Sequence, residues 1–168
     1  MSSRSLLALG ALLLLSACGF QLRGSATVPF DTLYLPRANT GIGLDLKRQI
    51  QAGTNAKVIE EQKQADAVLA FTEEIRQKEV LSLTSAGRVR EFQLRYRVGF
   101  RVHDQRNRDY VPNTTIQLTR DVTFNDADIL AKEQEEQLLY RDMQADMVQQ
   151  IIRRLAAAKP PPPKPAPQ

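Results

Sequence analysis

The 168-residue sequence has one cysteine, one histidine and no tryptophan. One cysteine excludes an internal disulfide, and one cysteine with one histidine excludes the common zinc sites built from these residues. Charge of one sign is hardly in excess, because 23 Lys and Arg oppose 19 Asp and Glu, for a net charge of +4. Both signs are mixed along the chain, so this excess does not indicate a nucleic-acid partner. The composition, 42% hydrophobic and 25% charged, is typical of one globular domain that buries a core.

No apolar run reaches the roughly 20 residues that a permanent transmembrane helix requires. The longest, residues 6–15, follows the positively charged Arg4 and precedes small residues, as in a secretory signal peptide. These small residues end in the one cysteine, Leu15-Ser16-Ala17-Cys18. The motif resembles the bacterial lipobox, in which the cysteine is lipidated before cleavage makes it the mature N-terminus. The alternative is an ordinary secretory signal with an unrelated free cysteine.

We therefore expect residues 1–17 to be a lipoprotein signal peptide and residues 18–29 to be a tether that begins at the lipidated Cys18. The expected lipid is S-diacylglycerol with an N-linked acyl chain such as palmitate, and no other cofactor is expected. Each buried acyl methylene contributes about 0.8 kcal/mol, so three chains would anchor the protein permanently. Gly19, not Asp, follows the cysteine, so the usual inner-membrane retention signal of bacterial lipoproteins is missing. The resemblance thus implies the outer membrane.

Hydrophobic periodicity predicts a two-layer α/β (α+β) sandwich, in which two helices cover one face of a small mixed or antiparallel sheet. The clearest strand is 91–103, where six apolar residues from Phe92 to Val102 alternate with polar residues and Gly99. Leu69, Phe71, Ile75, Leu81 and Leu83 share one parity in the strand 67–83, and we expect them on one face. Further strands are expected at 30–35, 57–60 and 116–124, with helices at 41–53 and after a cap at Asn125 or Asp126.

The second helix has a core stripe at every fourth residue from Leu139 to Leu155. A single domain is expected to span residues 30–158. Residues 159–168 contain six prolines and are expected to form an extended, disordered tail.

No motif indicates catalysis or a metal site. His103 has no recognisable Ser or Cys nucleophile motif to serve, and Cys18 is taken by lipid. Gly41-Ile42-Gly43 begins like a dinucleotide-binding loop, but Leu46 stands where that motif requires glycine. We expect a protein that is not an enzyme.

Basic residues concentrate in and around the strand 91–103. Arg95, Arg97 and Arg101 lie on its polar face, with further arginines at Arg88, Arg90 and Arg120. Guanidinium groups bind phosphate through paired hydrogen bonds, and lipopolysaccharide (LPS) is the abundant polyanionic lipid of an outer membrane. Alternatively, these arginines only solubilise the open face of the sheet and pair with Glu73, Glu79 or Glu91. The residues alone favour this second interpretation.

A resemblance changes that balance. Cys18-Gly19-Phe20-Gln21-Leu22-Arg23-Gly24 resembles the mature N-terminus of the LPS-assembly lipoprotein family LptE. The likeness continues in Glu91-Phe92-Gln93-Leu94, in Ala131-Lys132-Glu133 and in Ile151-Ile152-Arg153-Arg154-Leu155, and so covers essentially the whole mature chain.

The resemblance implies a lipoprotein on the periplasmic side of the outer membrane that sits as a plug in the lumen of the LptD β-barrel. The pair would receive LPS and insert it into the outer leaflet. It also implies LPS-binding basic residues at a strand hairpin and before the last helix. Lys132 matches the second position, whereas the hairpin turn is Ser85-Ala86-Gly87, with Arg88 and Arg90 displaced from the family's position.

We therefore expect Arg88, Arg90 and Lys132 to contact LPS, followed by Arg95 and Arg97. One alternative is a scaffold or chaperone lipoprotein for an outer-membrane β-barrel that has no direct LPS contact. Another is a lipoprotein of a different envelope machine.

Overall fold

The computed structural model describes residues 26–125 and 128–161. The predicted signal peptide, Cys18, Asp126 and most of the predicted tail lie outside these residues. The elements in chain order are β1 (Thr32–Tyr34), α2 (Gly41–Gly53), β2 (Lys57–Ile59), the short 3-10 helix η1 (Gln62–Gln64), β3 (Ala67–Leu83), β4 (Val89–His103), β5 (Asp109–Thr123) and α3 (Ile129–Ala156).

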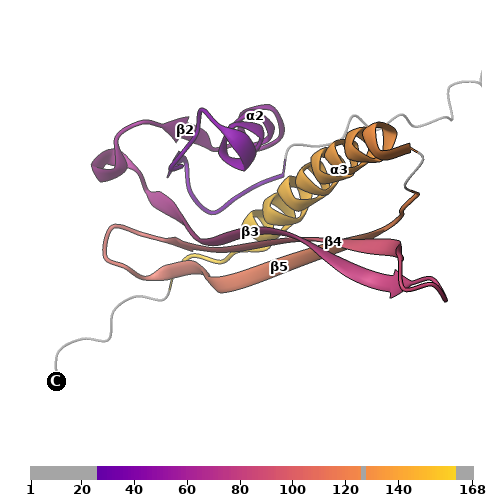
Figure 1. Ribbon diagram of the computed structural model, residues 1–168. Helices are drawn as coiled ribbons and strands as arrows, with labels where there is room; N and C mark the ends of the chain where they lie inside the picture. The colour runs from indigo at the N-terminus through magenta and orange to yellow at the C-terminus, as the bar shows by residue number, and fades with distance from the viewer. Residues whose placement is uncertain (1–25, 126–127, 162–168) are drawn as a thin grey trace, which may run out of the picture.

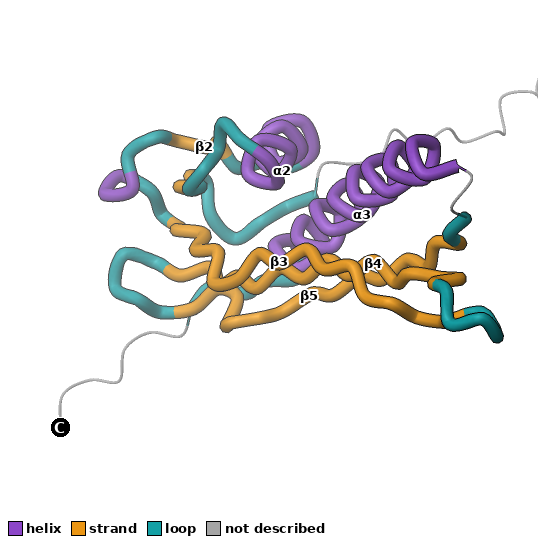
Figure 2. The backbone as a smooth tube through the Cα atoms, viewed as in Figure 1, coloured by secondary structure: helices purple, strands orange, loops and turns teal. Residues whose placement is uncertain are grey.

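The strands form one mixed five-stranded sheet in the order β2-β1-β3-β4-β5. β1 is parallel to β2 and to β3, whereas β3, β4 and β5 form an antiparallel meander. Both helices lie on the same side of the sheet, and the other side is open (Figure 1; Figure 2). This arrangement confirms the predicted two-layer α/β sandwich.

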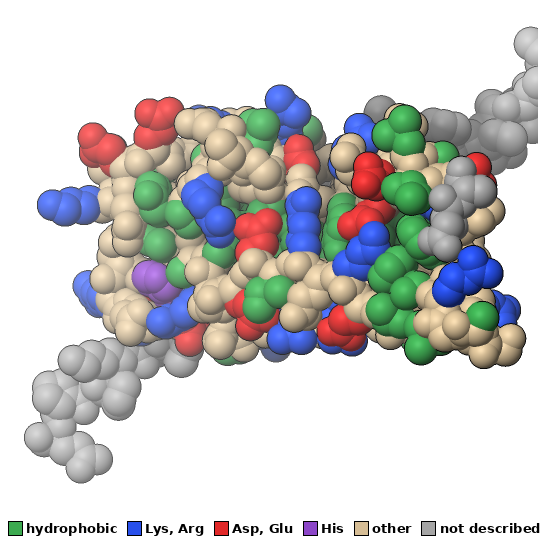
Figure 3. Space-filling model, in the orientation of Figure 1, with side chains coloured by type: hydrophobic (Ala, Val, Ile, Leu, Met, Phe, Trp, Pro, Cys, Tyr) green, Lys and Arg blue, Asp and Glu red, His purple; other side chains and the backbone are tan. Residues whose placement is uncertain are grey.

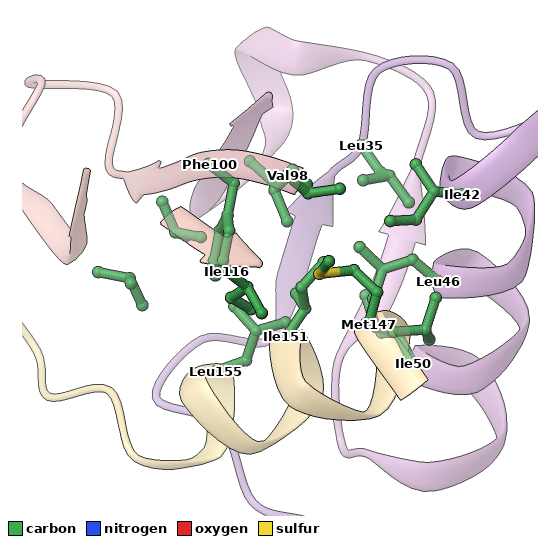
Figure 4. Close-up of a cluster of buried hydrophobic side chains, with 14 of the residues drawn as sticks. Leu35, Ile42, Leu46, Ile50, Val98, Phe100, Ile116, Met147, Ile151 and Leu155 are labelled. Carbon is green, nitrogen blue, oxygen red and sulfur yellow. The ribbon is translucent and has the colours of Figure 1, made fainter. Parts of the chain in front are cut away.

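The core forms where the helical stripes meet the even-numbered residues of β4. In α2, Ile42, Leu46 and Ile50 are spaced four residues apart and are almost completely buried. They face Met147 and Ile151 of α3, and the sheet closes the cluster with residues such as Val98 and Phe100 (Figure 4). The spacing that predicted each helix therefore also supplies its packed face.

One prediction about β3 is wrong. Its register with β4 shifts between Phe71, opposite Phe100, and Glu73, opposite Gly99. This β-bulge reverses the alternation, so that Ile75 lies opposite Arg97 on the open side. Gly99 permits the bulge, because a Cβ there would come within 2.5 Å of the Thr72 hydroxyl oxygen.

The predicted start of α3 is also wrong. The helix begins at Ile129 after Asp128, and the Asn125 side chain donates a hydrogen bond to the Asp128 carboxylate (3.3 Å). The buried residues of α3 begin only at Met143. Its first fourteen residues, 129–142, carry only partly buried or exposed side chains. α3 thus has a packed C-terminal half and a loosely covered N-terminal half.

β5 begins seven residues earlier than predicted, at Asp109. It is an edge strand, and an edge tolerates Pro112, which has no N–H to donate. The turn before it is built around the buried Asp104, whose carboxylate accepts backbone hydrogen bonds from Arg106 (2.9 Å) and Arg108 (2.8 Å). Burial opposes ionisation of Asp104, but hydrogen bonds from Arg108 and Arg106 outweigh it and lower the pKa of the carboxyl.

Candidate functional site

The β3–β4 hairpin places Arg88 and Arg90 at the end of the sheet nearest to the start of α3. Arg88 follows the Thr84–Gly87 turn and Arg90 lies in β4, and both side chains are exposed. The backbone carbonyl of Arg90 accepts a hydrogen bond from the N–H of Phe124 (2.8 Å), which fixes its place beside the end of β5. The Arg90 side chain makes no hydrogen bond or ion pair with any residue that the structure describes.

Lys132 lies in the first turn of α3, directly after the loop that leaves β5. Its Nζ is 2.8 Å from a carboxylate oxygen of Glu135 and 3.3 Å from the hydroxyl oxygen of Thr123. Arg90 and Lys132 therefore contact consecutive residues, Phe124 and Thr123. Two basic residues that are 42 positions apart in the sequence lie at the same end of the molecule.

Arg95 and Arg97 lie elsewhere, on the open face toward the middle of β4. Arg95 is five residues from Arg90, or about 17 Å along an extended strand. Arg95 forms an ion pair with Glu79 (2.9 Å), and Arg97 forms one with Glu73 (3.3 Å). These glutamates are two of the three partners that the sequence suggested. The five predicted residues thus separate into two groups. The terminal group is Arg88, Arg90 and Lys132, and the ion-paired central group is Arg95 and Arg97.

An apolar surface that was not predicted from the sequence lies at the terminal group. Five large hydrophobic side chains here are between 47% and 71% exposed. We call them the apolar tip: Val80, Leu81, Leu83, Ile129 and Leu130. Hydrophobic side chains gather at this end in the space-filling view, with Lys and Arg side chains beside them (Figure 3). Parity within β3 had placed Leu81 and Leu83 on the same face as Leu69, which is buried.

Two aromatic side chains lie beside the apolar tip, where Phe92 is the β4 partner of Val80. The Phe92 and Phe124 rings pack edge to face with centroids 5.3 Å apart, and both side chains are partly buried. Lys78 Nζ lies 4.4 Å from the centroid of the Phe92 ring and forms an ion pair with Glu136 of α3 (2.6 Å). The terminal group thus presents cations next to an apolar surface, a combination suited to an anionic amphiphile.

Other kinds of site find little support in the part of the chain that the structure describes. No three His, Cys, Asp or Glu side chains there are grouped so that they could hold a metal ion. His103 lies at the opposite end of β4, where its Nδ1 is 2.8 Å from the Asp104 carbonyl oxygen. Among the same residues, no helix combines the length and the hydrophobicity needed to cross a membrane.

Comparison with known proteins gives one family and several similar structures. The family model described as LptE, lipopolysaccharide-assembly, matches residues 26–155. A solution NMR structure of lipoprotein B from Nitrosomonas europaea is 45% identical over 83% of this chain and 91% of its own, with a TM-score of 0.71. No curated protein matches the chain.

Two crystal structures share the fold at lower identity. Rare lipoprotein B from Shewanella oneidensis is 22% identical, covering 76% of this chain and 95% of its own, with a TM-score of 0.65. A minor lipoprotein from Acinetobacter baumannii is 24% identical, covering 79% and 99%, with a TM-score of 0.63.

Proposed function

The chain belongs to the LptE family, and from this premise we propose that it is a non-catalytic outer-membrane lipoprotein that plugs the LptD β-barrel and binds LPS during its assembly into the outer leaflet. The proposal requires three properties of the chain: a lipid anchor, a surface suited to a barrel lumen and a site for LPS.

The observation that carries the proposal is the juxtaposition at one end of the sheet of Arg90, Lys132 and the apolar tip. LPS presents phosphates next to acyl chains, and these two surfaces match that chemistry. Arg90 is available because no described side chain neutralises it, whereas Lys132 is held in place by Glu135 and Thr123. Arg88 lies two residues from Arg90 and is the third cation proposed here.

The anchor is proposed to be lipid on Cys18. In the intact mass of the mature protein, we expect acyl additions on an N-terminal Cys18. An unmodified cysteine, or a mature chain that begins at another residue, would contradict this part of the proposal.

The open face of the sheet is proposed to face the barrel wall. A barrel lumen is polar, and this face carries the ion pairs of Arg95 and Arg97 together with Gln93 and Gln117. Paired charges keep such a face polar without a large net charge. The side that carries the helices includes Ile129 and Leu130, two exposed residues of the apolar tip, and is less suited to a wet wall.

The test of LPS binding is a double charge reversal, Arg90→Glu with Lys132→Glu. Charge-assisted hydrogen bonds contribute about 1.5–3 kcal/mol each, so losing two should weaken LPS binding at low salt by an order of magnitude or more. A second variant, Arg90→Glu with Lys132→Gln, avoids placing a carboxylate against Glu135. The matched control is Arg48→Glu with Arg153→Glu, two exposed arginines outside the terminal group. Circular dichroism checks that each variant is folded.

The second candidate function is the scaffold without LPS contact. The ion pairs Arg95–Glu79 and Arg97–Glu73 favour it, because they give these two arginines a structural role. Undiminished LPS binding by both double variants would leave the scaffold as the better explanation. A loss that is equal in the control would mean diffuse attraction to net positive charge rather than a site.

A further inference from the structure

A second cationic surface lies on the side of the molecule, away from the terminal group. A depression of about 430 Å³ lies between β3 and the middle of α3 and is lined by Arg76, Gln137, Tyr140 and Arg141. Its lining carries two positive charges and no negative one. Neither the sequence motifs nor the proposed function assigns it a role.

Arg76 is exposed and yet held in place. Its guanidinium lies 4.8 Å from the centroid of the Tyr96 ring and 5.5 Å from that of Tyr140. One Nη donates a hydrogen bond to the Gln144 side-chain oxygen (2.5 Å), and the Tyr140 hydroxyl donates to the Gln77 carbonyl (2.8 Å). A guanidinium has five N–H donors, so this bond to Gln144 leaves several that can bind a ligand. A positioned donor loses little entropy on binding.

Acidic side chains close to the depression are engaged by other groups, and Asp45 accepts a hydrogen bond from the Gln144 amide (2.6 Å). Glu136 forms its ion pair with Lys78, and Glu74 accepts a hydrogen bond from the Tyr96 hydroxyl (3.0 Å) and pairs with Arg37 (3.2 Å). Arg141 is exposed and has no ion pair with any described residue. The positive charge of the two arginines is therefore not cancelled within their own pocket.

We propose that this depression binds a phosphate group, free or carried by a sugar, between the guanidinium groups of Arg76 and Arg141. Two guanidinium groups can grip a tetrahedral dianion with several parallel N–H···O bonds, and the Gln137 amide can add one more. Lys132 and Arg141 are nine residues apart, which is about 13 Å along the helix and half a turn around it. The depression is therefore separate from the terminal group, and this proposal does not rest on LPS binding there.

The test is an NMR titration of the full-length protein, labelled with ¹⁵N-arginine, in non-ionic detergent at low salt. The probes are inorganic phosphate, glucosamine 1-phosphate and unphosphorylated glucosamine. We expect the Nε–Hε signals of Arg76 and Arg141 to shift with both phosphates and not with glucosamine. Arg141→Gln should weaken binding about tenfold, as expected for one lost charge-assisted bond. Arg153→Gln, an exposed arginine in the last turn of α3, is the matched control and should leave it unchanged.

Arg141→Gln breaks no hydrogen bond or ion pair with a described residue and changes an exposed side chain, so the variant should remain folded. Tighter binding of glucosamine 1-phosphate than of phosphate supports the site and assigns the ligand to a phosphorylated sugar. Equal binding supports the site and assigns recognition to the phosphate alone. The proposal is overturned if neither phosphate shifts these signals, or if Arg153→Gln weakens binding as much as Arg141→Gln.

Discussion

The double substitution Leu83→Ser with Leu130→Ser tests whether the apolar tip contacts the acyl part of a ligand. Leu83 ends β3 and Leu130 lies at the start of α3, and they are 56% and 71% exposed. Because neither side chain belongs to the buried core, the folded domain should lose little on their removal. Surface changes of this kind usually alter the free energy of unfolding by less than about 0.5 kcal/mol.

The expected effect on binding follows from the area that remains exposed. Burying a whole leucine side chain contributes about 1.5–3 kcal/mol. Somewhat more than half of each side chain is available, so complete coverage by a ligand would contribute about 1–2 kcal/mol per leucine. Partial coverage of both still predicts LPS binding that is weaker by about tenfold or more.

The assay is a titration of the full-length protein with LPS at low and high salt. Added salt should reduce the effect of the Arg90 and Lys132 reversals, because it screens exposed charges. It should leave the effect of the leucine substitutions, since burial of apolar surface is not screened. Leu138→Ser is the control, because Leu138 is 52% exposed on α3 but lies outside the tip. Unchanged LPS binding by the double variant, or an equal loss in the control, would refute a role for the tip.

Three further predictions concern stability. Ile151→Ala should lower the free energy of unfolding, measured by urea denaturation, by about 2–5 kcal/mol, because Ile151 is fully buried. Leu138→Ala, at an exposed position, should change it by less than about 0.5 kcal/mol. The Asp104→Asn variant should lose less stability in acid than the parent protein. The pKa of Asp104 is lowered by folding, so the stabilisation from its ionised carboxylate is present above pH 3.8 and is lost as the pH falls through the folded-state pKa. Burial, with Glu74 nearby, raises the pKa of Tyr96 from 10.0 to about 12, so its stabilisation is lost as the pH rises between these values. The Tyr96→Phe variant should therefore lose less stability than the parent protein as the pH rises over this alkaline range, as measured by circular dichroism. For either of these two variants, a pH dependence of stability equal to that of the parent protein would contradict the prediction.

The elements with one strong local pattern were predictable from the sequence. The strict alternation of 91–103 gave β4 to within two residues, and the bounds of α2 and β3 agree with those predicted. The direction of β3 side chains was not predictable, because the bulge at Thr72 depends on the missing Cβ of Gly99 in another strand. A pattern within one strand does not contain that contact. The early part of β5 was missed for a related reason, since an edge strand with Pro112 lacks regular alternation.

The candidate site was predictable only in part. Sequence likeness singled out Lys132 and the basic hairpin, and the fold brings Arg90 and Lys132 to one end of the sheet. The sequence suggested Glu73 and Glu79 among the partners of the sheet arginines, but it could not tell which glutamate pairs with which arginine, because that depends on the register across the bulge. The apolar tip was not predictable either, because a sequence does not distinguish an exposed leucine from a leucine in the core.

The distribution of burial along α3 connects these findings. From Met143 onward the helix is held by a packed apolar core, with polar contacts to the sheet such as Arg120 with Asp146 added to it. Before Met143 it is held mainly by polar contacts, such as Lys78 with Glu136 and the Tyr140 hydroxyl with Gln77. Exposed ion pairs contribute only about 0–1 kcal/mol each, so this half is attached less strongly than the other. Both proposed ligand sites lie along this weakly held half, where Leu130 and Arg141 remain exposed because the core does not extend to them.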